Sequence, residues 1–458
     1  MNFINKRITI MGIGLLGGGI GTAKFFAEQG ARVLVTDLKS KEELTGSIEQ
    51  LSPFSTIKYV LGKHREQDFI ETDMVVRNPA VPQESAYLAI AREHGVPVEM
   101  AESLFLKEAR ERKITNIIGV TGTRGKSTTS AMIFDILKKA GKSTYIAGNV
   151  KDTSTLELLT NDNLTPDSYV VLELSSWQLE SLGWHKISPH IAVITNIYPD
   201  HLNRYASMEQ YIQAKSNIFL FQSSEDHVVL HEENEQTKLF AAKARSSVHW
   251  FSSKSVPDDV SISLSGGGAG GHNRENAGAA YIVCSILSIE QKIIKDALEN
   301  FHGLPGRLEH LGLIHEVTVI NDTTSTTPTS GIKAIESIQP DKGIVLVIGG
   351  NSKNLPLKEL IAAIKKRVKA IVYLTGTGTD DVKDKIQDTP IPSAGPFESM
   401  QDTMTACFKF AEPGDVILFS PSFTSFGQFK NEFERGEVFH AAYNAAATND
   451  KKTDSREQ

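Results

Sequence analysis

A glycine-rich segment near residue 120 contains the residue types that hold nucleotide phosphates. An apolar stretch leads into a loop that reads Gly122-Thr-Arg-Gly125-Lys126-Ser127, and a helical pattern follows. In such a loop backbone N–H groups form an anion-binding nest, the lysine reaches the outer phosphates, and the serine hydroxyl can bind Mg²⁺. The general motif has glycine five residues before its final glycine, whereas this chain has Val120. We therefore predict a phosphate loop of a shorter form.

A second glycine-rich turn lies close to the N-terminus. Gly12-Ile-Gly14-Leu-Leu-Gly17 follows a predicted strand and precedes a helix, and Asp37 ends the next predicted strand. This is the dinucleotide-binding fingerprint in its usual setting, where glycines let the backbone approach a pyrophosphate at a helix N-terminus. Two readings stay open: an NAD-linked oxidoreductase, or a Rossmann-like turn that uses glycine only for close packing. The turn predicts a phosphate-binding shape and leaves the ligand unidentified.

Three further side chains could take part in chemistry: two lie at or after predicted strand ends and one lies in a predicted helix. Glu173 ends an apolar strand, where α/β enzymes place catalytic groups, and a carboxylate beside a phosphate loop favours a Mg²⁺ site. His201 follows another strand within Pro-Asp-His-Leu, and Lys215 lies in a predicted helix. Taken alone, the histidine is more often structural and the lysine more often solvated. Their residue types by themselves therefore leave the chemistry of these two positions open.

Apolar strand-like runs alternate with helical stretches almost throughout, which is the pattern of parallel α/β sheets. The clearest predicted strands cover residues 7–12, 32–37, 74–77, 116–121, 169–174, 191–196, 317–321, 343–349, 370–374 and 415–420. Each glycine turn opens a separate nucleotide-binding type of domain. We predict a Rossmann-like domain at 1–103, a central P-loop ATPase-like domain at 104–303, a Rossmann-like domain at 304–445, and a disordered tail at 446–458.

Composition narrows the class of protein. The chain has 458 residues with a net charge of -7, and no basic patch that would indicate a nucleic-acid partner. Cys284 and Cys407 lie far apart in sequence, which argues against a disulfide framework or a zinc site and fits a reducing compartment. No signal peptide and no membrane-spanning stretch is recognisable. We expect a soluble, cytoplasmic protein that is a monomer.

Several segments, in order along the chain, resemble those of the Mur ligases and their folylpolyglutamate synthetase relatives. The Thr-Gly-Thr-x-Gly-Lys-Ser loop after an apolar strand is the first of them. The others are Leu172-Glu-Leu-Ser-Ser-Trp-Gln-Leu-Glu180, Thr195-Asn-Ile-Tyr-Pro-Asp-His-Leu-Asn-Arg204, Tyr211-Ile-Gln-Ala-Lys215, Gly271-His-Asn-Arg-Glu-Asn276, Gly303-Leu-Pro-Gly-Arg307, Ile320-Asn-Asp322 and Ser420-Pro-Ser-Phe-Thr-Ser-Phe-Gly-Gln-Phe-Lys430. Together they extend over residues 7–440. Within the family, the second and last segments resemble the ligases that add glutamate.

The resemblance implies a set of site residues. For ATP it implies Gly122, Thr123, Arg124, Gly125, Lys126, Ser127, Thr128, Asn273, Asn276, Arg307 and Asp322, with the two asparagines on adenine. For the metal it implies Ser127, Glu173, His201 and a carbamylated Lys215. For the UDP-linked substrate it implies Gly14, Leu15, Leu16, Asp37, Asn149, Ser175 and Gln178, and for the amino acid Thr326, Lys353, Ser425 and Phe426. Lys126, His201, Lys215 and Arg307 would be the catalytic group. From the residues alone, Asn273 could equally be a helix N-cap.

The resemblance also implies a reaction, with ATP and Mg²⁺ as cofactors. ATP would phosphorylate the carboxylate of UDP-N-acetylmuramoyl-L-alanine, and the amine of D-glutamate would attack the resulting acyl phosphate. Little covalent chemistry falls to such a protein, which positions the reactants and stabilises charge. The first glycine turn would then bind UDP, with no nicotinamide required.

The match to the family has departures. The family usually reads Asp-Ser-Lys-Ala-Thr where this chain has Asp322-Thr-Thr-Ser-Thr326, so Thr324 replaces a lysine. Gly306 stands where a histidine is usual, and Glu432 where an aromatic residue is expected. These changes affect the identity of the amino acid more than the reaction class. Alternatives are a ligase for L-glutamate or another amino acid, an NAD-dependent oxidoreductase, and a non-catalytic nucleotide-binding homologue.

Overall fold

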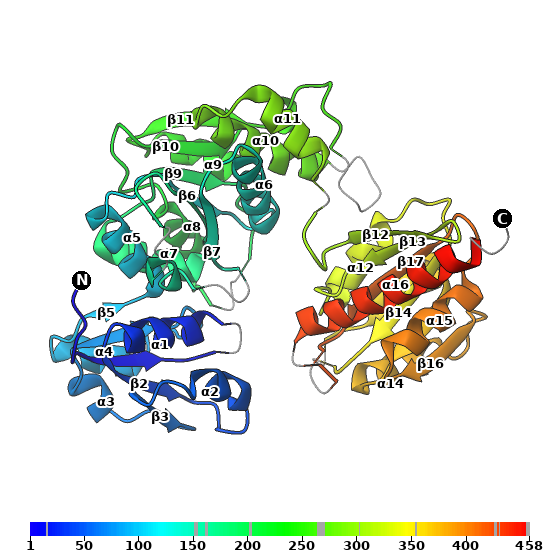
Figure 1. Ribbon diagram of the computed structural model, residues 1–458, viewed down its shortest axis with the longest axis horizontal. Coiled ribbons are helices and arrows are strands. Elements are labelled where there is room, and N and C mark those ends of the chain that lie inside the picture. The colour runs from blue at the N-terminus through cyan, green and yellow to red at the C-terminus, as the bar shows by residue number, and fades with distance from the viewer. Residues whose placement is uncertain are drawn as a thin grey trace. The chain divides into compact units, whose positions relative to one another are not determined.

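The chain forms two compact units, which the computed structural model in Figure 1 traces. The structure describes residues 1–14, 17–150, 154–160, 164–200, 204–262, 271–301, 303–352, 355–425, 428–429 and 431–454. The first unit contains residues 1–262 and 271–299, and the second begins at Asn300. Two sheets lie in the first unit and one in the second. The predicted boundary at Ser103 falls inside a helix of the first unit.

The N-terminal sheet is fully parallel in the order β3-β2-β1-β4-β5. Its strands are β1 (Arg7–Met11), β2 (Arg32–Asp37), β3 (Ile57–Leu61), β4 (Met74–Arg77) and β5 (Val98–Glu99), and its helices are α1 (Gly18–Glu28), α2 (Thr45–Leu51), α3 (Gln67–Ile70) and α4 (Ala86–Glu93). Neighbouring strand residues point to opposite faces, so Ile10 packs in the core that contains α1 and α2, and Met11 in the core that contains α3 and α4. This is the Rossmann-like arrangement that the sequence predicts.

The central sheet is also parallel, in the order β11-β10-β9-β6-β8-β7. Its strands are β6 (Ile117–Thr121), β7 (Thr144–Gly148), β8 (Tyr169–Glu173), β9 (Ile191–Ile194), β10 (His227–His231) and β11 (Ser247–Phe251). The helices of this part are α5 (Ala101–Glu111), α6 (Lys126–Lys139), α7 (Ser176–His185), α8 (Met208–Ser216), α9 (Glu235–Ala241), α10 (Gly271–Ile286) and α11 (Gln291–Glu299), with short 3₁₀ turns at Glu157–Thr160 and Ser253–Ser255. Strand β6 is central, so the phosphate loop leaves the sheet with β9 on one side and β8 on the other.

The second unit has one sheet in the order β12-β13-β17-β14-β15-β16, antiparallel only between β12 and β13. Its strands are β12 (Glu309–Ile314), β13 (Val317–Asn321), β14 (Ile344–Gly349), β15 (Val368–Leu374), β16 (Ser393–Phe397) and β17 (Val416–Ser422). Helices α12 (Pro328–Ser337), α13 (Lys358–Arg367) and α14 (Thr377–Ile386) pack on one face, and α15 (Met400–Phe410) and α16 (Glu432–Asp454) on the other.

The C-terminal helix differs from the prediction. The sequence predicts a disordered tail from residue 446, whereas α16 continues to Asp454. Its first half packs Phe439 flat against Phe419 of β17, with ring centroids 4.0 Å apart, and this contact anchors the helix to the sheet. Once a helix is started, each further residue adds a backbone hydrogen bond, so the alanine-rich continuation extends it. No helix in the part of the chain that the structure describes is long and apolar enough to cross a membrane.

A buried ion pair joins the two sheets of the first unit. The Arg77 guanidinium ends β4 and donates to Glu180 Oε2 of α7 at 2.7 Å, with both side chains almost inaccessible to solvent. The other oxygen of Glu180 accepts from Tyr205 Oη at 3.0 Å. Arg77 also lies over the ring of Trp184 at 5.0 Å. Removal of one partner would leave an uncompensated charge in an apolar contact, which is the costly way to break such a pair.

We expect Arg77→Met to lower the free energy of unfolding of the first unit by about 3 kcal/mol, because it leaves Glu180 buried and unpaired. Urea unfolding followed by tryptophan fluorescence would measure the change. Arg92→Met is the matched control: Arg92 also lies over Trp184, at 5.8 Å, but is exposed. Its loss should be below about 1 kcal/mol. Equal losses in the two variants would contradict the importance of the buried pair.

Candidate active site

The phosphate loop connects β6 to α6 and depends on two glycines. Gly122 has φ +148° and Gly125 has φ +82°, which is the left-handed conformation that favours glycine. A Cβ atom at Gly122 would collide with the Thr195 hydroxyl, and one at Gly125 with the Asn276 side chain. The loop is therefore packed closely on both sides. Ser127 and Thr128 are half-buried in the first turn of α6, where helix N–H groups lack partners within the helix and suit an anion.

The segment that follows β9 holds the loop in shape. Asn196 accepts from Thr123 N through its backbone oxygen at 2.9 Å and from Arg124 N through Oδ1 at 2.9 Å. Thr195 Oγ1 donates to Arg124 O at 2.6 Å. Sequence reasoning assigned no role to these two residues, although both lie in the Thr195–Arg204 segment that it singled out. The hydroxyl of Tyr211 lies 3.1 Å from Thr123 Oγ1 and was missed in the same way.

Two lysine side chains converge on the loop. Lys126 Nζ donates to Gly122 O at 3.1 Å and to Thr123 O at 3.2 Å. Lys215 Nζ, from α8, donates to Gly122 O at 2.8 Å and to Thr121 Oγ1 at 3.3 Å. Lys215 is only 2% exposed. Burial, together with the positive charge of Lys126, lowers the pKa of Lys215 well below its ordinary value, although Asp200 and Glu173 act in the opposite direction. A buried lysine with a depressed pKa spends more time as the neutral amine.

Glu173 provides the carboxylate at this edge of the sheet. It ends β8, is buried, and its Oε1 accepts from Asn149 Nδ2 at 2.9 Å. This hydrogen bond holds Asn149, a predicted contact of the UDP-linked substrate, beside the carboxylate. Among the described residues no group of three or more His, Cys, Asp or Glu side chains is placed to hold a metal ion. The donor set nevertheless fits Mg²⁺, which needs few protein carboxylates when phosphate oxygens and water complete its shell.

Helix α10 faces the phosphate loop through Asn276. Its Oδ1 accepts from Thr129 Oγ1 at 3.4 Å, and the same side chain packs against Gly125. Asn273 lies three residues earlier on the helix and is half-buried. The helix begins at Gly271, so Asn273 is inside its first turn and is not the N-cap. Arg274, between them, fixes the helix start by donating to the backbone oxygens of Ser253, Val256, Pro257 and Val260.

The first glycine turn follows β1, as predicted, with Gly12, Gly14 and Gly17 all at positive φ. Both carboxylate oxygens of Asp37 accept backbone N–H groups, Oδ2 from Ile13 and Oδ1 from Lys39, each at 2.9 Å. In this structure Asp37 therefore stabilises the turn. Five predicted site residues lie outside the described residues: Leu15, Leu16, His201, Lys353 and Phe426.

Ser175 and Gln178 form a capping box at the start of α7. Gln178 Oε1 accepts from Ser175 N at 2.9 Å, and Ser175 Oγ accepts from Gln178 N at 3.3 Å. The amide of Gln178 also donates to Glu102 Oε1 of α5 at 2.7 Å. The predicted substrate contacts at these two positions therefore have structural partners already. Glu102 itself escaped sequence reasoning, because nothing in its local pattern distinguishes it from a solvated helix glutamate.

In the second unit, the predicted residues gather where β13 and β17 end. Asp322 Oδ2 accepts from Ser420 Oγ at 2.8 Å and Oδ1 from Leu308 N at 3.2 Å. Burial raises the pKa of Asp322 to about 6, although these hydrogen bonds and Arg307 oppose the shift. Arg307 is exposed.

The loops that carry Thr326 and Ser425 are joined by a backbone hydrogen bond from Ser422 N to Ser325 O at 2.8 Å. Ser425 is buried, and its hydroxyl has no hydrogen-bond partner among the described residues. The two predicted amino-acid contacts thus belong to one edge of this sheet.

Family models match most of the chain. The Mur ligase MurD-like N-terminal domain matches residues 6–99, the Mur ligase middle domain residues 120–267, and the Mur ligase glutamate ligase domain residues 306–423. A UDP-N-acetylmuramoylalanine--D-glutamate ligase of Roseiflexus sp. (strain RS-1) is 38% identical, over 96% of this chain and 98% of that protein. The chain belongs to the Mur ligase family.

Further Mur ligases agree with this assignment. A ligase of the same name from Borreliella afzelii (strain PKo) is 35% identical over 95% of this chain and 97% of that protein. The crystal structure of UDP-N-acetylmuramate-alanine ligase MurC from Thermotoga maritima has a TM-score of 0.58 at 19% identity, covering 96% of this chain and all of that one. At this low identity, the likeness to the Thermotoga maritima structure shows a shared fold and nothing more.

Two departures from the Mur ligase pattern contact each other. Thr324 donates to Gly306 O through both its backbone N, at 3.0 Å, and its Oγ1, at 2.9 Å. Next to them, the fully buried Arg435 of α16 donates to Thr323 O at 2.8 Å and to Phe423 O at 3.1 Å. Burial lowers the pKa of Arg435 to about 10, with Glu432 and Asp322 opposing the shift. Arg435 was missed by sequence reasoning, and here it ties the Asp322–Thr326 loop to α16.

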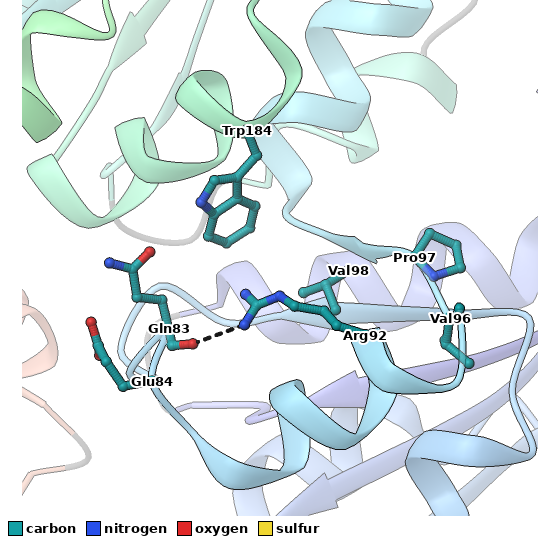
Figure 2. A pocket seen from close by; sticks show the side chains of 8 residues that line it. Gln83, Glu84, Arg92, Val96, Pro97, Val98 and Trp184 are labelled. Atoms are coloured by element: carbon teal, nitrogen blue, oxygen red, sulfur yellow. Dashed lines mark hydrogen bonds between the residues drawn. The ribbon is translucent and has the colours of Figure 1, made fainter.

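The first unit also has a surface hollow that contains none of the site residues described above. It is lined by Gln83, Glu84, Arg92, Gly95, Val96, Pro97, Val98 and Trp184, none of which is a predicted site residue. Figure 2 shows the Arg92 side chain lying beneath the Trp184 indole and donating to Gln83 O at 3.2 Å. The Arg92 guanidinium of this hollow thus already has a hydrogen-bond partner. The hollow contains none of the phosphate-binding or carboxylate groups described above.

We expect Asn196→Ala to weaken ATP binding about thirtyfold, because both side-chain hydrogen bonds to Arg124 are lost, at about 1 kcal/mol each. In these bonds Oδ1 accepts from Arg124 N at 2.9 Å and Nδ2 donates to Arg124 O at 3.2 Å. Calorimetric titration with ATP and Mg²⁺ would measure the dissociation constant. Asn217→Ala is the control, since it removes a side-chain hydrogen bond to Leu179 O away from the loop. An equal effect of both changes would show that Asn196 acts only through general stability.

Proposed function

We propose that the protein is an ATP-dependent ligase that joins D-glutamate to UDP-N-acetylmuramoyl-L-alanine during synthesis of the peptidoglycan precursor. One observation carries the chemistry: the phosphate loop, the buried Lys215 amine and the Glu173 carboxylate lie at the carboxyl edge of one sheet. The names of the curated relatives, matched over nearly the whole chain, support the choice of substrates.

The proposed reaction has two steps. A carboxylate oxygen of the alanyl substrate attacks the γ-phosphorus of ATP, the bond to the β-phosphate oxygen breaks, and ADP leaves. The neutral amine of glutamate then attacks the acyl phosphate carbon, a proton is lost from nitrogen, and inorganic phosphate departs as the amide forms. The protein's part is to hold the phosphates and to neutralise charge, which we assign to Lys126 and Arg307.

We assign the remaining contacts with ATP to the phosphate loop, to α10 and to Asp322. Residues 122–128 of the loop would cradle the phosphates, Asn273 and Asn276 would bind adenine, and Asp322 would bind the ribose. The support is the packing of Asn276 on Gly125, which brings an amide side chain against the loop.

Mg²⁺, when bound here, would supply stabilisation of the charge that develops on the phosphates. Ser127 and Glu173 are the described residues whose oxygens suit it, and His201 is proposed as a further ligand. We also propose that the Lys215 amine attacks CO₂ and loses one proton, which yields a carbamate whose two oxygens share one negative charge. Its burial and its lowered pKa support this, because only the neutral amine is a nucleophile.

Other assignments complete the proposal. Residues 1–103 bind the UDP-linked substrate through Gly14, Leu15, Leu16 and Asp37, with Asn149, Ser175 and Gln178 on the sugar side. Residues 104–303 bind ATP. Residues 304–445 bind glutamate through Thr326, Lys353, Ser425 and Phe426. We propose that the protein acts in the cytoplasm as a monomer.

Phosphate release from ATP tests the function. With Mg²⁺ and UDP-N-acetylmuramoyl-L-alanine, we expect release with D-glutamate and none with L-glutamate or without an amino acid, since the acyl phosphate needs an amine of the right geometry to react. Preference for L-glutamate would keep the reaction class and correct the substrate. No release with any amino acid would refute the ligase assignment and favour a non-catalytic nucleotide-binding protein.

Carbon-13 NMR tests the Lys215 assignment. In buffer with ¹³C-labelled bicarbonate we expect one carbamate resonance in the wild type and its absence in Lys215→Arg, because a guanidinium does not react with CO₂. Lys138→Arg serves as the control, because Lys138 is a lysine in the last turn of α6. A resonance that persists in Lys215→Arg would rule out Lys215 as the modified residue.

A further inference from the structure

A cluster of imidazole side chains lies at the edge of the central sheet opposite the phosphate loop. His190 comes directly before β9, His227 begins β10, and His249 is in the middle of β11. These strands run parallel to β6 and β8, so the amino ends of β9 and β10 lie at the edge away from Glu173, which ends β8. The cluster is therefore separate from the candidate active site, and none of its residues has a part in the proposed reaction.

Two of these imidazoles face each other across the last two strands of the sheet. His249 pairs in register with Val229, two residues after His227, so both histidines point to the same face. His227 Nδ1 and His249 Nε2 are 3.1 Å apart, and the centroids of the two rings are 5.1 Å apart. In such a pair one nitrogen carries the hydrogen and the other offers a lone pair. The two nitrogens thus converge on one point between the strands.

The separation of these two nitrogens suits one transition-metal ion. A bond from zinc to imidazole is about 2.0–2.1 Å long, so two nitrogens on one ion are about 2.9 Å apart at a right angle and about 3.3 Å apart at the tetrahedral angle. The observed 3.1 Å lies inside this interval. An ion could therefore replace the shared hydrogen if the rings tilt, without any movement of the backbone.

The groups around the pair are compatible with a cation. Asp226 directly precedes His227, and its Oδ1 lies 2.8 Å from His190 Nδ1. Its Oδ2 accepts from Ser223 N at 2.6 Å and from Ser223 Oγ at 2.9 Å, which fixes the carboxylate. The His190 ring packs edge-on against His227, with centroids 5.5 Å apart. All three imidazoles are half-buried, so they are held in place and are still accessible from solvent.

The number and type of ligands decide which ion fits. In the part of the chain that the structure describes, no group of three or more His, Cys, Asp or Glu side chains is placed to hold a metal ion, so this pair supplies two ligands and water completes the shell. Imidazole suits Zn²⁺, Cu²⁺ and Ni²⁺, whereas Mg²⁺ prefers oxygen. The pair is therefore suited to an ion of a different class from the Mg²⁺ proposed beside the phosphate loop.

We propose that His227 and His249 together bind one Zn²⁺ ion, which joins β11 to β10. The inference is independent of the proposed function. Strand β11 is the outermost strand of the central sheet (Figure 1), so a metal bridge adds a second link to the backbone pairing that holds it on β10. Because the two histidines come together only in the folded chain, the ion binds the native state and stabilises it.

Calorimetric titration of Zn²⁺ into the chelator-treated, full-length protein tests the proposal, with millimolar Mg²⁺ present so that sites preferring oxygen are occupied. We expect the wild type to bind one Zn²⁺ more than His227→Gln and one more than His249→Asn. The double variant should lose the same single ion, since both residues hold it. His94→Gln is the matched control, because His94 is an exposed histidine whose Nδ1 contacts Ile90 O of its own helix. It should bind as many ions as the wild type.

The same number of bound ions in the wild type and in both single variants would overturn the proposal. Loss of the ion in only one of them would also overturn it, because the ion would then not bridge the pair. Thermal melting identifies any variant that fails to fold, and in that case His249→Cys decides, since a thiolate also binds Zn²⁺. This variant should keep the ion, and Co²⁺ in its place should show sulfur-to-metal absorption in the near ultraviolet. A folded His249→Cys protein without that absorption would contradict the metal bridge.

Discussion

The hydrogen bonds between the phosphate loop and the segment after β9 fix the conformation on which the candidate active site depends. Because β9, β6 and β8 are parallel neighbours, their carboxyl ends reach the same edge, so Asn196, the loop and Glu173 meet without any long-range adjustment. Gly122 and Gly125 allow this closeness, since a Cβ atom at either would displace the partners. Lys215 then enters from α8 and finds loop oxygens that are already oriented.

The two sheets of the first unit share polar contacts that are unusually well buried. Arg77 of β4 pairs with Glu180 of α7 across the two parts, and Glu102 of α5 accepts from Gln178 of the same helix α7. Buried polar pairs constrain geometry more than apolar contacts do, because each has one favourable orientation.

The sequence predicted the fold and part of the site because those features have local patterns. Two strand–glycine turn–helix units, the parallel sheets, and Lys126, Glu173 and Lys215 at one sheet edge all follow from periodicity and from the family resemblance. Short or half-exposed strands such as β3, β11 and β16 were not recognised, since their apolar runs are weak.

Polar partners that are distant in sequence could not be predicted either. Asn196 binds a residue 72 positions away, Gln178 binds Glu102 over 76 positions, and Arg435 reaches Thr323 over 112. A single polar residue carries no local sign of such a partner. The C-terminal residues were predicted to be a disordered tail, whereas they extend α16. The contact of Phe439 with Phe419 anchors this helix, although the polar composition of its last residues alone does not favour one.

The contact between Gly306 and the Asp322–Thr326 loop restricts which residues positions 306 and 323 can hold together. A Cβ atom at Gly306 would lie 2.6 Å from the Thr323 methyl group, and Gly306 has φ +70°. The serine that the family usually has at position 323 lacks that methyl group and leaves room for the histidine that usually stands at 306. Glycine at 306 and threonine at 323 are therefore compatible with each other, whereas a larger residue at 306 would collide with the Thr323 methyl group.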